Sequence, residues 1–407
     1  MAKGLIVQKY GGSSVANIER IQNAAKRVVD YRKKGYSLVV VVSALGDTTD
    51  ELIALAKKIN GYPPEREMDM LISTGEQVSA ALLAMAIDRL GFKVISFTGA
   101  QVGIMTDKTH TKARILDINT RRIDEEIKKG KIVVVAGFQG VTSEQDITTL
   151  GRGGSDLTAV ALAKALCAKY CEIYSDVEGI YTADPRIVPK ARKLEMISYD
   201  EMLEMASLGA QVMQARSIEV AKKFNVVIHA RSSFSKKRGT IICKEVRKME
   251  DVVVSGVNLN KNESKITICD VPDKPGLAAK IFNAISEKNI NVDMIVQNTS
   301  RSRITDISFT VPNEVLKRAA RVTRNIARKI GAGRIFEDTD IVRLSIVGVG
   351  MKSHPGIAAK MFDVLAEHKI NIEMISTSNI SISCIIKKKF GEAAVKAIHD
   401  KFNLGKK

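Results

Sequence analysis

Short apolar runs recur along the first 245 residues and predict the strands of one large sheet. Each run is of strand length and rich in valine and isoleucine: 4–8, 38–43, 94–97, 132–137, 172–174 and 226–229. Continuously apolar runs, unlike alternating ones, are typical of parallel strands that are buried on both faces. The pattern therefore predicts a mainly parallel sheet with a layer of helices on each side.

Helical patterns lie between several of these runs. The clearest is "NIERIQNAAKRVVDYRKKG" at residues 17–35. Its apolar positions fall on one helical face: Ile18, Ile21, Ala25, Val28 and Val29. Gly35 follows the last periodic position, where glycine commonly ends a helix. Strands and helices thus alternate, which is the α/β class.

The pattern changes near residue 245, where a polar connector leads into an internal duplication. "ITICDVPDKPGLAAKIFNAISEKNINVDMIVQ" (266–297) and "LSIVGVGMKSHPGIAAKMFDVLAEHKINIEMIST" (344–377) share their order of strand, Pro-Gly turn, helix and strand. A further strand, 305–311 or 381–386, and a second helix, 313–330 or 391–402, follow in each copy. The repeated unit reads βαββαβ and predicts two ferredoxin-like modules.

The second copy runs out of residues before its final strand. Only "NLGKK" remains after its last helix, whereas the apolar run "VVVSGVNL" (252–259) precedes the first copy without an assigned place. We predict that this run completes the sheet of the second module, so that the two modules interlock. The expected division is 1–245, a connector and strand at 246–263, and modules at 264–338 and 339–407.

Composition adds little to this picture but excludes several classes of protein. The chain has 407 residues, 45% of them apolar, which is enough for two or three globular domains. No secretory h-region opens the sequence, and its longest apolar runs are far shorter than a membrane span. We expect a soluble, cytoplasmic protein. The five cysteines have no framework spacing and predict free thiols, with Cys167 and Cys171 as buried apolar residues rather than metal ligands.

The formal charge of +18 raises nucleic-acid binding as a hypothesis. The densest basic stretch, 316–329, has no aromatic residues for base stacking. Its alanines, Val322 and Ile326 fit the apolar face of a helix whose other face is basic and solvated. We therefore expect no specific nucleic-acid site, although a positive field would favour an anionic substrate.

Candidate chemistry lies in loops that follow the predicted strands. In "QKYGGSSV" (8–15), Lys9 and two glycines offer a full charge and closely approaching backbone N–H groups to a phosphate. "TTLGRGGSD" (148–156) enters a helix with Ser155 or Asp156 as its cap, and places Arg152 where it can clamp a carboxylate or phosphate. Similar loops occur at 42–52, 70–84 and 172–186. Loops of this kind at one edge of a parallel sheet predict a ligand site.

Together these motifs resemble the bacterial aspartate kinases (aspartokinases). "KYGGSSV", "SALGDTTDEL", "STGEQVSA", "TTLGRGGSDLTAVALA" and "YSDVEGIYTADPR" stand in the family's order, and the duplicated tail resembles its paired ACT domains. The resemblance covers nearly the whole chain and is to the monofunctional kind. It implies the amino-acid-kinase three-layer αβα sandwich followed by two ACT modules. Relatives of this fold phosphorylate acetylglutamate, glutamate or UMP, whereas the tail and "GRGGSD" favour aspartate.

The resemblance implies transfer of a phosphoryl group from ATP to the side-chain carboxylate of L-aspartate. Lys9 would neutralise the transferring group, and Asp156 would orient Lys9. The implied substrate contacts come from the following residues: Ser43, Thr49, Glu76, Arg152, Gly153, Gly154 and Ser155. In these, Arg152 would hold the α-carboxylate and Glu76 the ammonium. The aspartate carboxylate is already ionised at neutral pH, so no general base is required.

The nucleotide, by the same resemblance, would lie against a second set of residues: Lys9, Tyr10, Gly11, Gly12, Ser175, Asp176, Tyr181, Asp184 and Arg186. ATP implies Mg²⁺, held mostly by phosphate oxygens and water, so we name no protein metal ligand. One position departs from the family. Many members have lysine in "GAKV" where this chain has Gln211, and Lys190 or Lys193 would have to replace it.

ACT pairs in this family bind lysine and threonine, which implies feedback regulation. The matching positions are Asp273, Lys274, Pro275, Gly276, Leu277, Ala278, Asn291 and Gln297 in the first copy, and Ala358, Asn371, Ile372 and Ser378 in the second. Exposed module edges also imply a dimer or larger assembly. In some relatives an internal start yields a separate regulatory subunit, and Met249 lies at that boundary.

Two other classes remain open on the residues alone. The chain could be an amino-acid sensor in which the first domain is a scaffold, although its intact Lys9, Glu76, Arg152 and Asp156 argue against a decayed site. It could also bind nucleic acid weakly through its dispersed charge, which a salt titration would reveal.

Overall fold

The computed structural model describes residues 3–210, 212–244, 253–298, 304–351 and 354–406. Within them the chain divides into two compact units. The first comprises 3–180, 193–206 and 212–244, and the second comprises 181–192, 207–210 and the described residues from 253 onward. Gln211, Met249 and the first part of the expected connector, residues 246–252, lie outside the described residues.

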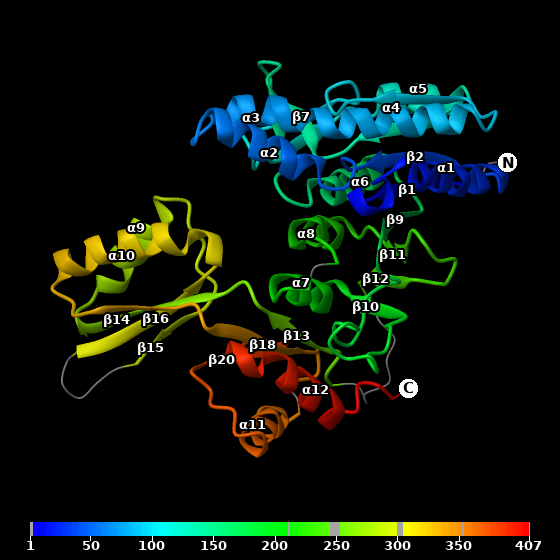
Figure 1. The fold of residues 1–407 in the computed structure, drawn as a ribbon. Helices are drawn as coiled ribbons and strands as arrows, with labels where there is room; N and C mark the ends of the chain where they lie inside the picture. The colour runs from blue at the N-terminus through cyan, green and yellow to red at the C-terminus, as the bar shows by residue number, and fades with distance from the viewer. Residues whose placement is uncertain (1–2, 211, 245–252, 299–303, 352–353, 407) are drawn as a thin grey trace. The chain divides into compact units, whose positions relative to one another are not determined.

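An eight-stranded sheet forms the centre of the first unit (Figure 1). Its order is β10-β12-β11-β9-β1-β2-β6-β3, and every pairing is parallel except that of β11 with β12. In that order the strands are Met196–Ser198, Thr240–Cys243, Ile228–Ser232, Tyr170–Ser175, Leu5–Tyr10, Ser37–Val42, Ile132–Ala136 and Val94–Phe97. The six strands predicted from apolar runs are all present, which confirms the mainly parallel sheet.

Helices cover both faces of this sheet. Helices α1 (Ile18–Lys33) and α4 (Thr74–Asp88) share one apolar cluster with alternate residues of the central strands. On the other face α6 (Gly154–Ala165) packs on β1 and against α8 (Ala215–Phe224). The remaining helices of the unit are α2 (Thr48–Ile59), α3 (Glu65–Ile72), α5 (Arg121–Lys128) and α7 (Tyr199–Ser207). The three-layer arrangement is therefore as the α/β pattern predicts.

The predicted apolar face of α1 is wrong at one end. Ile21, Val28 and Val29 are buried, but the side chain of Ile18, the first residue of the helix, is 75% exposed. Gly35 follows the helix with φ of +91°, a conformation that favours glycine, as expected of a residue that ends a helix.

A second, smaller sheet in the first unit has no counterpart in the sequence prediction. Its order is β5-β4-β7-β8, with strands Ile115–Ile118, Ile104–Thr106, Gln139–Val141 and Ile147–Thr149. Three of the strands have only three residues, too short to leave a periodic signal. Helix α3 packs against β8.

The first ferredoxin-like module is a four-stranded antiparallel sheet in the order β15-β16-β14-β17. The strands are Ile295–Gln297, Ile304–Val311, Ser264–Pro272 and Ile335–Asp338, with helices α9 (Leu277–Ser286) and α10 (Leu316–Ile330). Helix α10 buries its alanines and packs Val322 and Ile326 against the core. The basic stretch is thus the solvated face of an amphipathic helix, as predicted.

The second module has the same sheet, but its fourth strand comes from elsewhere in the chain. The order is β19-β20-β18-β13, with strands Met374–Thr377, Ser381–Lys387, Ile341–Val347 and Gly256–Asn260, and helices α11 (Ile357–Glu367) and α12 (Gly391–Lys401). Strand β13 pairs antiparallel with β18 and takes the place that β17 holds in the first module. This pairing is the one predicted for the run at 252–259, and it interlocks the modules.

A segment between two strands of the large sheet folds with the second module. Residues 181–192 belong to the second unit. The N–H of Val257 in β13 donates to the carbonyl of Thr182 at 2.8 Å, and the Thr182 hydroxyl lies 3.0 Å from Nε2 of the buried His399 on α12. Ala183 and Val188 complete the apolar core of the module.

Two smaller expectations also have their outcome here. The helical stretch Glu65–Asp88, which comprises α3 and α4, is long and apolar enough to cross a membrane by length and composition. In the protein it covers the sheet, and 44% of its most apolar part is buried there. All five cysteines are free thiols. Cys171 is buried as expected, but Cys167 is exposed because it follows α6 in a turn with φ of +51°.

The interlocked strand gives a test of stability. Val257 is 1% exposed in the core of the second module, whereas Val349 beside β18 is 51% exposed. Val257→Ala should lower the free energy of unfolding by about 2 kcal/mol, because it removes buried methyl groups and leaves a cavity. The same deletion at Val349 should change it by less than about 0.5 kcal/mol. Urea unfolding of both variants measures this, and equal effects would contradict the burial of β13.

Candidate functional site

The loops that follow the central parallel strands meet at one edge of the large sheet. The N–H of Gly11, after β1, donates to the carbonyl of Tyr174 in β9 at 3.1 Å, and the N–H of Ser43, after β2, donates to the carbonyl of Tyr10 at 3.0 Å. Because parallel strands end at the same edge, their polar loops are brought together there. The predicted placement of "KYGG" and "SALGD" side by side is therefore what the sheet produces.

Lys9 and Asp156 form the central ion pair of this edge. Lys9 is the penultimate residue of β1, and its Nζ lies 2.7 Å from Oδ1 of Asp156 in the first turn of α6. The two side chains are only 11% and 7% exposed. A Cβ on Gly11 would lie 3.3 Å from this Nζ, so glycine leaves room beside the ammonium group. The lysine is thus held in place with open space on one side.

Helix α6 begins differently from the prediction. Its N-cap is Gly153, with φ of +67°, and neither Ser155 nor Asp156 caps it, since both lie inside the first turn. Gly154 starts the helix against the ring of Phe138, and a Cβ on Gly137 would lie 2.9 Å from the Ser155 hydroxyl oxygen. Glycine before the helix frees the Asp156 carboxylate to face Lys9 instead of the helix N–H groups.

Close packing joins the loop at 43–47 to two neighbours. A Cβ on Gly12 would lie 3.0 Å from the carbonyl oxygen of Ala44, and a Cβ on Gly75 would lie 2.8 Å from the Ala44 Cβ. Ser43 is the first residue of this loop, and Thr49 lies in the first turn of α2, which follows it. The glycines therefore let the loop approach both the β1 loop and the start of α4.

Glu76 is a buried carboxylate with one free oxygen. It lies in the first turn of α4, 3% exposed, and its Oε1 accepts a hydrogen bond from the N–H of Ala44 at 3.2 Å. Its Oε2 has no hydrogen-bond partner among the described residues. Burial raises the pKa of Glu76 from 4.5 to about 7, against the smaller opposing effects of the Ala44 N–H, of its own backbone N–H and of the Lys9 charge. An ammonium ligand would satisfy the free oxygen.

Arg152 does not join the buried cluster. Its side chain is 96% exposed and lies 3.9 Å from Asp50, itself 68% exposed. It stands between Gly151 and Gly153, both in the left-handed region. The structure therefore places Arg152 on an open loop beside α2.

The residues expected near the nucleotide are divided between the two units. Ser175 ends β9 and Asp176 follows it in the first unit, whereas Tyr181, Asp184 and Arg186 belong to the second. Arg186 donates hydrogen bonds to Asp184 and holds the pKa of that carboxyl below its usual value.

Tyr10 and Lys193 were also expected near the nucleotide, and the side chains of both make contacts within the protein. The Tyr10 side chain is buried and stacks on Tyr174 with ring centroids 4.8 Å apart, which leaves only its backbone for a ligand. Lys193, one suggested replacement for the missing lysine, donates to the carbonyl of Arg238.

All of the expected effector residues of the first copy except Asn291 line a cavity of about 270 Å³. It is bounded by Val271, Pro272, Asp273, Lys274, Pro275, Gly276, Leu277, Ala278, Gln297 and Ile307. Gly276, with φ of +88°, is the N-cap of α9. Asn291 is exposed and does not line this cavity. In the second copy Ala358 and Ile372 pack against the module core, whereas Asn371 and Ser378 are exposed.

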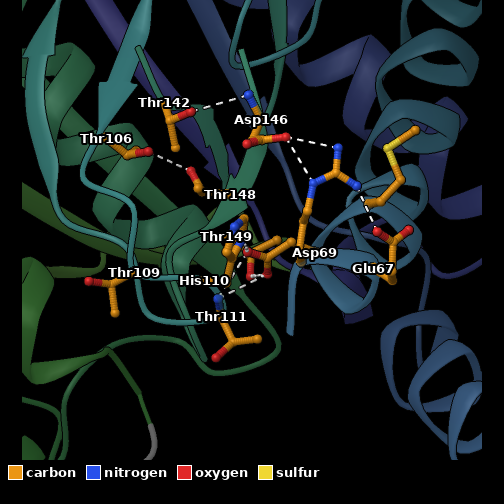
Figure 2. A network of polar contacts seen from close by, with 12 residues as sticks. Glu67, Asp69, Thr106, Thr109, His110, Thr111, Thr142, Asp146, Thr148 and Thr149 are labelled. Atoms are coloured by element: carbon orange, nitrogen blue, oxygen red, sulfur yellow. Dashed lines mark hydrogen bonds and ion pairs between the residues drawn. The ribbon is translucent and has the colours of Figure 1, made fainter. Parts of the chain in front are cut away.

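One polar cluster near the site escaped the sequence reasoning. Asp69 on α3 is fully buried and accepts hydrogen bonds from His110, Thr111 and Thr149 (Figure 2). The position of Asp69 in the sequence could have revealed this cluster, because Asp69 lies three residues before the buried Ile72 on the apolar face of its helix. A charged residue on a buried face is paired or hydrogen-bonded.

Comparison with known proteins agrees with this geometry. The amino acid kinase family model matches residues 4–231, and ACT domain models match 265–328 and 344–402. An aspartate kinase of Pseudomonas putida is 52% identical over 401 residues, 98% of each chain. An aspartokinase of Thermus thermophilus is 50% identical over 407 residues, 99% of each chain. The chain belongs to the aspartate kinases.

Solved structures extend the likeness to the fold of other aspartate kinases. Escherichia coli aspartokinase III in complex with aspartate and ADP matches with a TM-score of 0.82, over 98% of this chain and 99% of that one. The same protein with lysine and aspartate matches with a TM-score of 0.76, over 98% of this chain and 99% of that one. Both are 23% identical to this chain, so they support the shared fold only.

The raised pKa of Glu76 gives this aspartate kinase a testable pH dependence. Below pH 7 the free carboxyl is mostly protonated and cannot pair with an ammonium group. We expect kcat/KM for aspartate to fall about tenfold per pH unit below 7 and to level off above it, as the free enzyme's titration dictates. Initial rates at subsaturating aspartate between pH 5.5 and 9 measure the profile.

Glu76→Gln is the matched control for this profile, because it keeps the shape of the side chain and cannot titrate. It should lower kcat/KM for aspartate and remove the acidic limb. An unchanged limb in the variant would assign the titration to another group.

Proposed function

We propose that the chain transfers the γ-phosphoryl group of ATP to the side-chain carboxylate of L-aspartate, which yields 4-phospho-L-aspartate. The main observation in support is that two buried charged groups, those of Lys9 and Glu76, lie at the same edge of the sheet. Asp156 holds Lys9 in place through an ion pair. Burial raises the pKa of Glu76 and the Lys9 charge opposes that rise, which shows that the two groups are near each other, and Oε2 of Glu76 has no hydrogen-bond partner among the described residues. A fixed cation suits a phosphoryl group in transit, and a free buried carboxylate oxygen suits an amino acid's ammonium group.

Positioning and charge neutralisation supply the chemistry in this proposal. The aspartate carboxylate is ionised at neutral pH, so it attacks without a general base. Lys9 offsets the negative charge of the two approaching anions, and Asp156 keeps the Nζ aimed at the reacting edge. Gly11 leaves space for phosphate oxygens beside the Lys9 ammonium, and Gly12 would supply a backbone N–H group.

Substrate recognition would use groups of opposite charge. Glu76 receives the ammonium through Oε2, and Arg152 receives the α-carboxylate with its planar guanidinium. Because Arg152 is exposed, its loop closes over the substrate in this proposal. The hydroxyls of Ser43, Thr49 and Ser155 and the backbone of Gly153 and Gly154 would complete the contacts.

The nucleotide would be held by the loops after β1 and β9. Mg²⁺ would travel with the nucleotide and neutralise its phosphates. The described residues contain no group of three or more His, Cys, Asp or Glu that could hold a metal ion.

Regulation would act through the ACT modules. The cavity beside α9 has the helix N-terminus for a carboxylate and Asp273 for an ammonium, as an amino-acid effector requires. We propose feedback inhibition by lysine, threonine or both, in a cytoplasmic enzyme that catalyses the first step toward these amino acids and methionine. Self-association through the ACT sheets into a dimer or larger assembly belongs to the same proposal.

The choice of phosphoryl acceptor is the direct test of this function. With ATP, Mg²⁺ and hydroxylamine, aspartate should give hydroxamate at a rate at least a hundredfold above glutamate or acetylglutamate. Lys9→Ala should lower kcat for aspartate at least a hundredfold while circular dichroism shows an intact fold. Near-normal turnover in that variant would remove Lys9 from the mechanism, and preference for another acceptor would overturn the substrate assignment.

Inhibition by end products tests the regulatory part separately. Lysine and threonine, alone and combined at millimolar concentration, should lower the rate, and Asp273→Ala should weaken that inhibition at least tenfold without changing the uninhibited rate. Asp363→Ala, which removes an exposed carboxylate from α11, is the control. Equal rates with and without both amino acids would reject feedback control.

A further inference from the structure

The buried carboxylate of Asp69 joins three separate segments of the chain (Figure 2). It belongs to α3 and is 0% exposed. Its Oδ2 lies 2.8 Å from Nδ1 of His110 and 2.9 Å from the N–H of Thr111, and its Oδ1 accepts the Thr149 hydroxyl at 2.5 Å. A carboxylate can only accept hydrogen bonds, so each of these partners is a donor.

The loop segment in this cluster has a conformation that needs support. Thr111 has φ of +63°, a left-handed conformation that is costly for a β-branched residue. Its N–H donates to both oxygens of Asp69, at 3.1 and 2.9 Å, and its carbonyl oxygen would lie 3.3 Å from a Cβ on Gly151. The contact with Asp69 therefore fixes a turn that lies against the start of the Arg152 loop.

The other two segments lead directly to proposed substrate groups. Helix α3 continues through Ser73 into α4, where Glu76 lies seven residues after Asp69. Strand β8 ends at Thr149, three residues before Arg152, and Thr149 also accepts the N–H of Ala113 on its carbonyl at 2.9 Å. The Asp69 carboxylate thus connects the helix that leads to Glu76 with the strand that leads to Arg152.

We propose that Asp69 is a positioning residue that sets the spacing between Glu76 and Arg152, and so tunes affinity for the amino-acid substrate. The inference rests on the proposed roles of those two residues. Binding a zwitterion between a carboxylate and a guanidinium requires both ends at a fixed separation, and small displacements weaken both contacts. The helix of Glu76 and the loop of Arg152 are far apart in sequence, and Asp69 with Thr149 connects them by a side-chain hydrogen bond.

The chemistry of the cluster requires a carboxylate and not an amide. Three donors converge on Asp69, so the NH₂ group of an asparagine would face at least one of them. Asp69→Asn should therefore open the cluster while preserving its volume. Thr149→Val removes one donor at nearly constant shape, and Thr149→Ser keeps that donor.

Steady-state kinetics of the full chain test this inference. Asp69→Asn and Thr149→Val should raise KM for aspartate at least tenfold, with KM for ATP within twofold and kcat within threefold of the parent. Tenfold corresponds to about 1.4 kcal/mol of binding free energy. Thr149→Ser should restore KM for aspartate to within twofold. Glu67→Gln, an exposed carboxylate on the same helix, is the control and should change nothing.

The possible results separate this inference from the proposed site. Unchanged KM for aspartate in Thr149→Val and in folded Asp69→Asn overturns it, as does a parallel rise in KM for ATP, which would indicate a general structural role. If Asp69→Asn does not fold, the KM values for aspartate of Thr149→Val and Thr149→Ser test the inference by themselves. Glu76→Gln and Arg152→Ala are measured alongside: if neither raises KM for aspartate, the proposed substrate site itself fails.

Discussion

The burial of the central strands on both faces is the constraint on which the rest of this protein depends. Strands β1, β2 and β6 have almost every side chain inside the protein, so they have no surface on which to carry chemistry. A ligand can reach polar groups only where the strands end, and parallel pairing places those ends at one edge. The position of Lys9 follows from this constraint, and so do the glycines that let neighbouring loops approach it.

Charge balance at that edge explains why the site is both stable and reactive. A buried lysine without a partner would be costly, and Asp156 supplies the partner without filling the space in front of the ammonium group. Glu76 lacks such a partner, and its pKa is raised because burial disfavours the charged form of its carboxylate. The site is therefore close to neutral where the phosphoryl group would pass and unsatisfied where an ammonium group would bind.

The sequence predicts most of the fold because its strongest signals are local. Continuous apolar runs reveal the parallel strands, and the duplication reveals the missing strand β13. The small sheet stays hidden since its strands are too short for periodicity, and Ile18 misleads because a helix end can extend past the core. Asp69 and Thr149 lie eighty residues apart, so only the folded chain brings them together. The exposure of Arg152 likewise depends on loop conformation, which residue type does not encode.

The segment 181–192 shows that the order of the sequence and the physical units of this kinase do not coincide. The family model for the kinase domain spans these residues, yet their apolar side chains complete the core of the second ACT module. Thr182 meets His399 and β13 there, which are contributed by distant parts of the chain. A chimaera that exchanges regulatory halves between two aspartate kinases at residue 245 would therefore divide a core. The exchanged half has to carry its own copy of 181–192 to remain compatible.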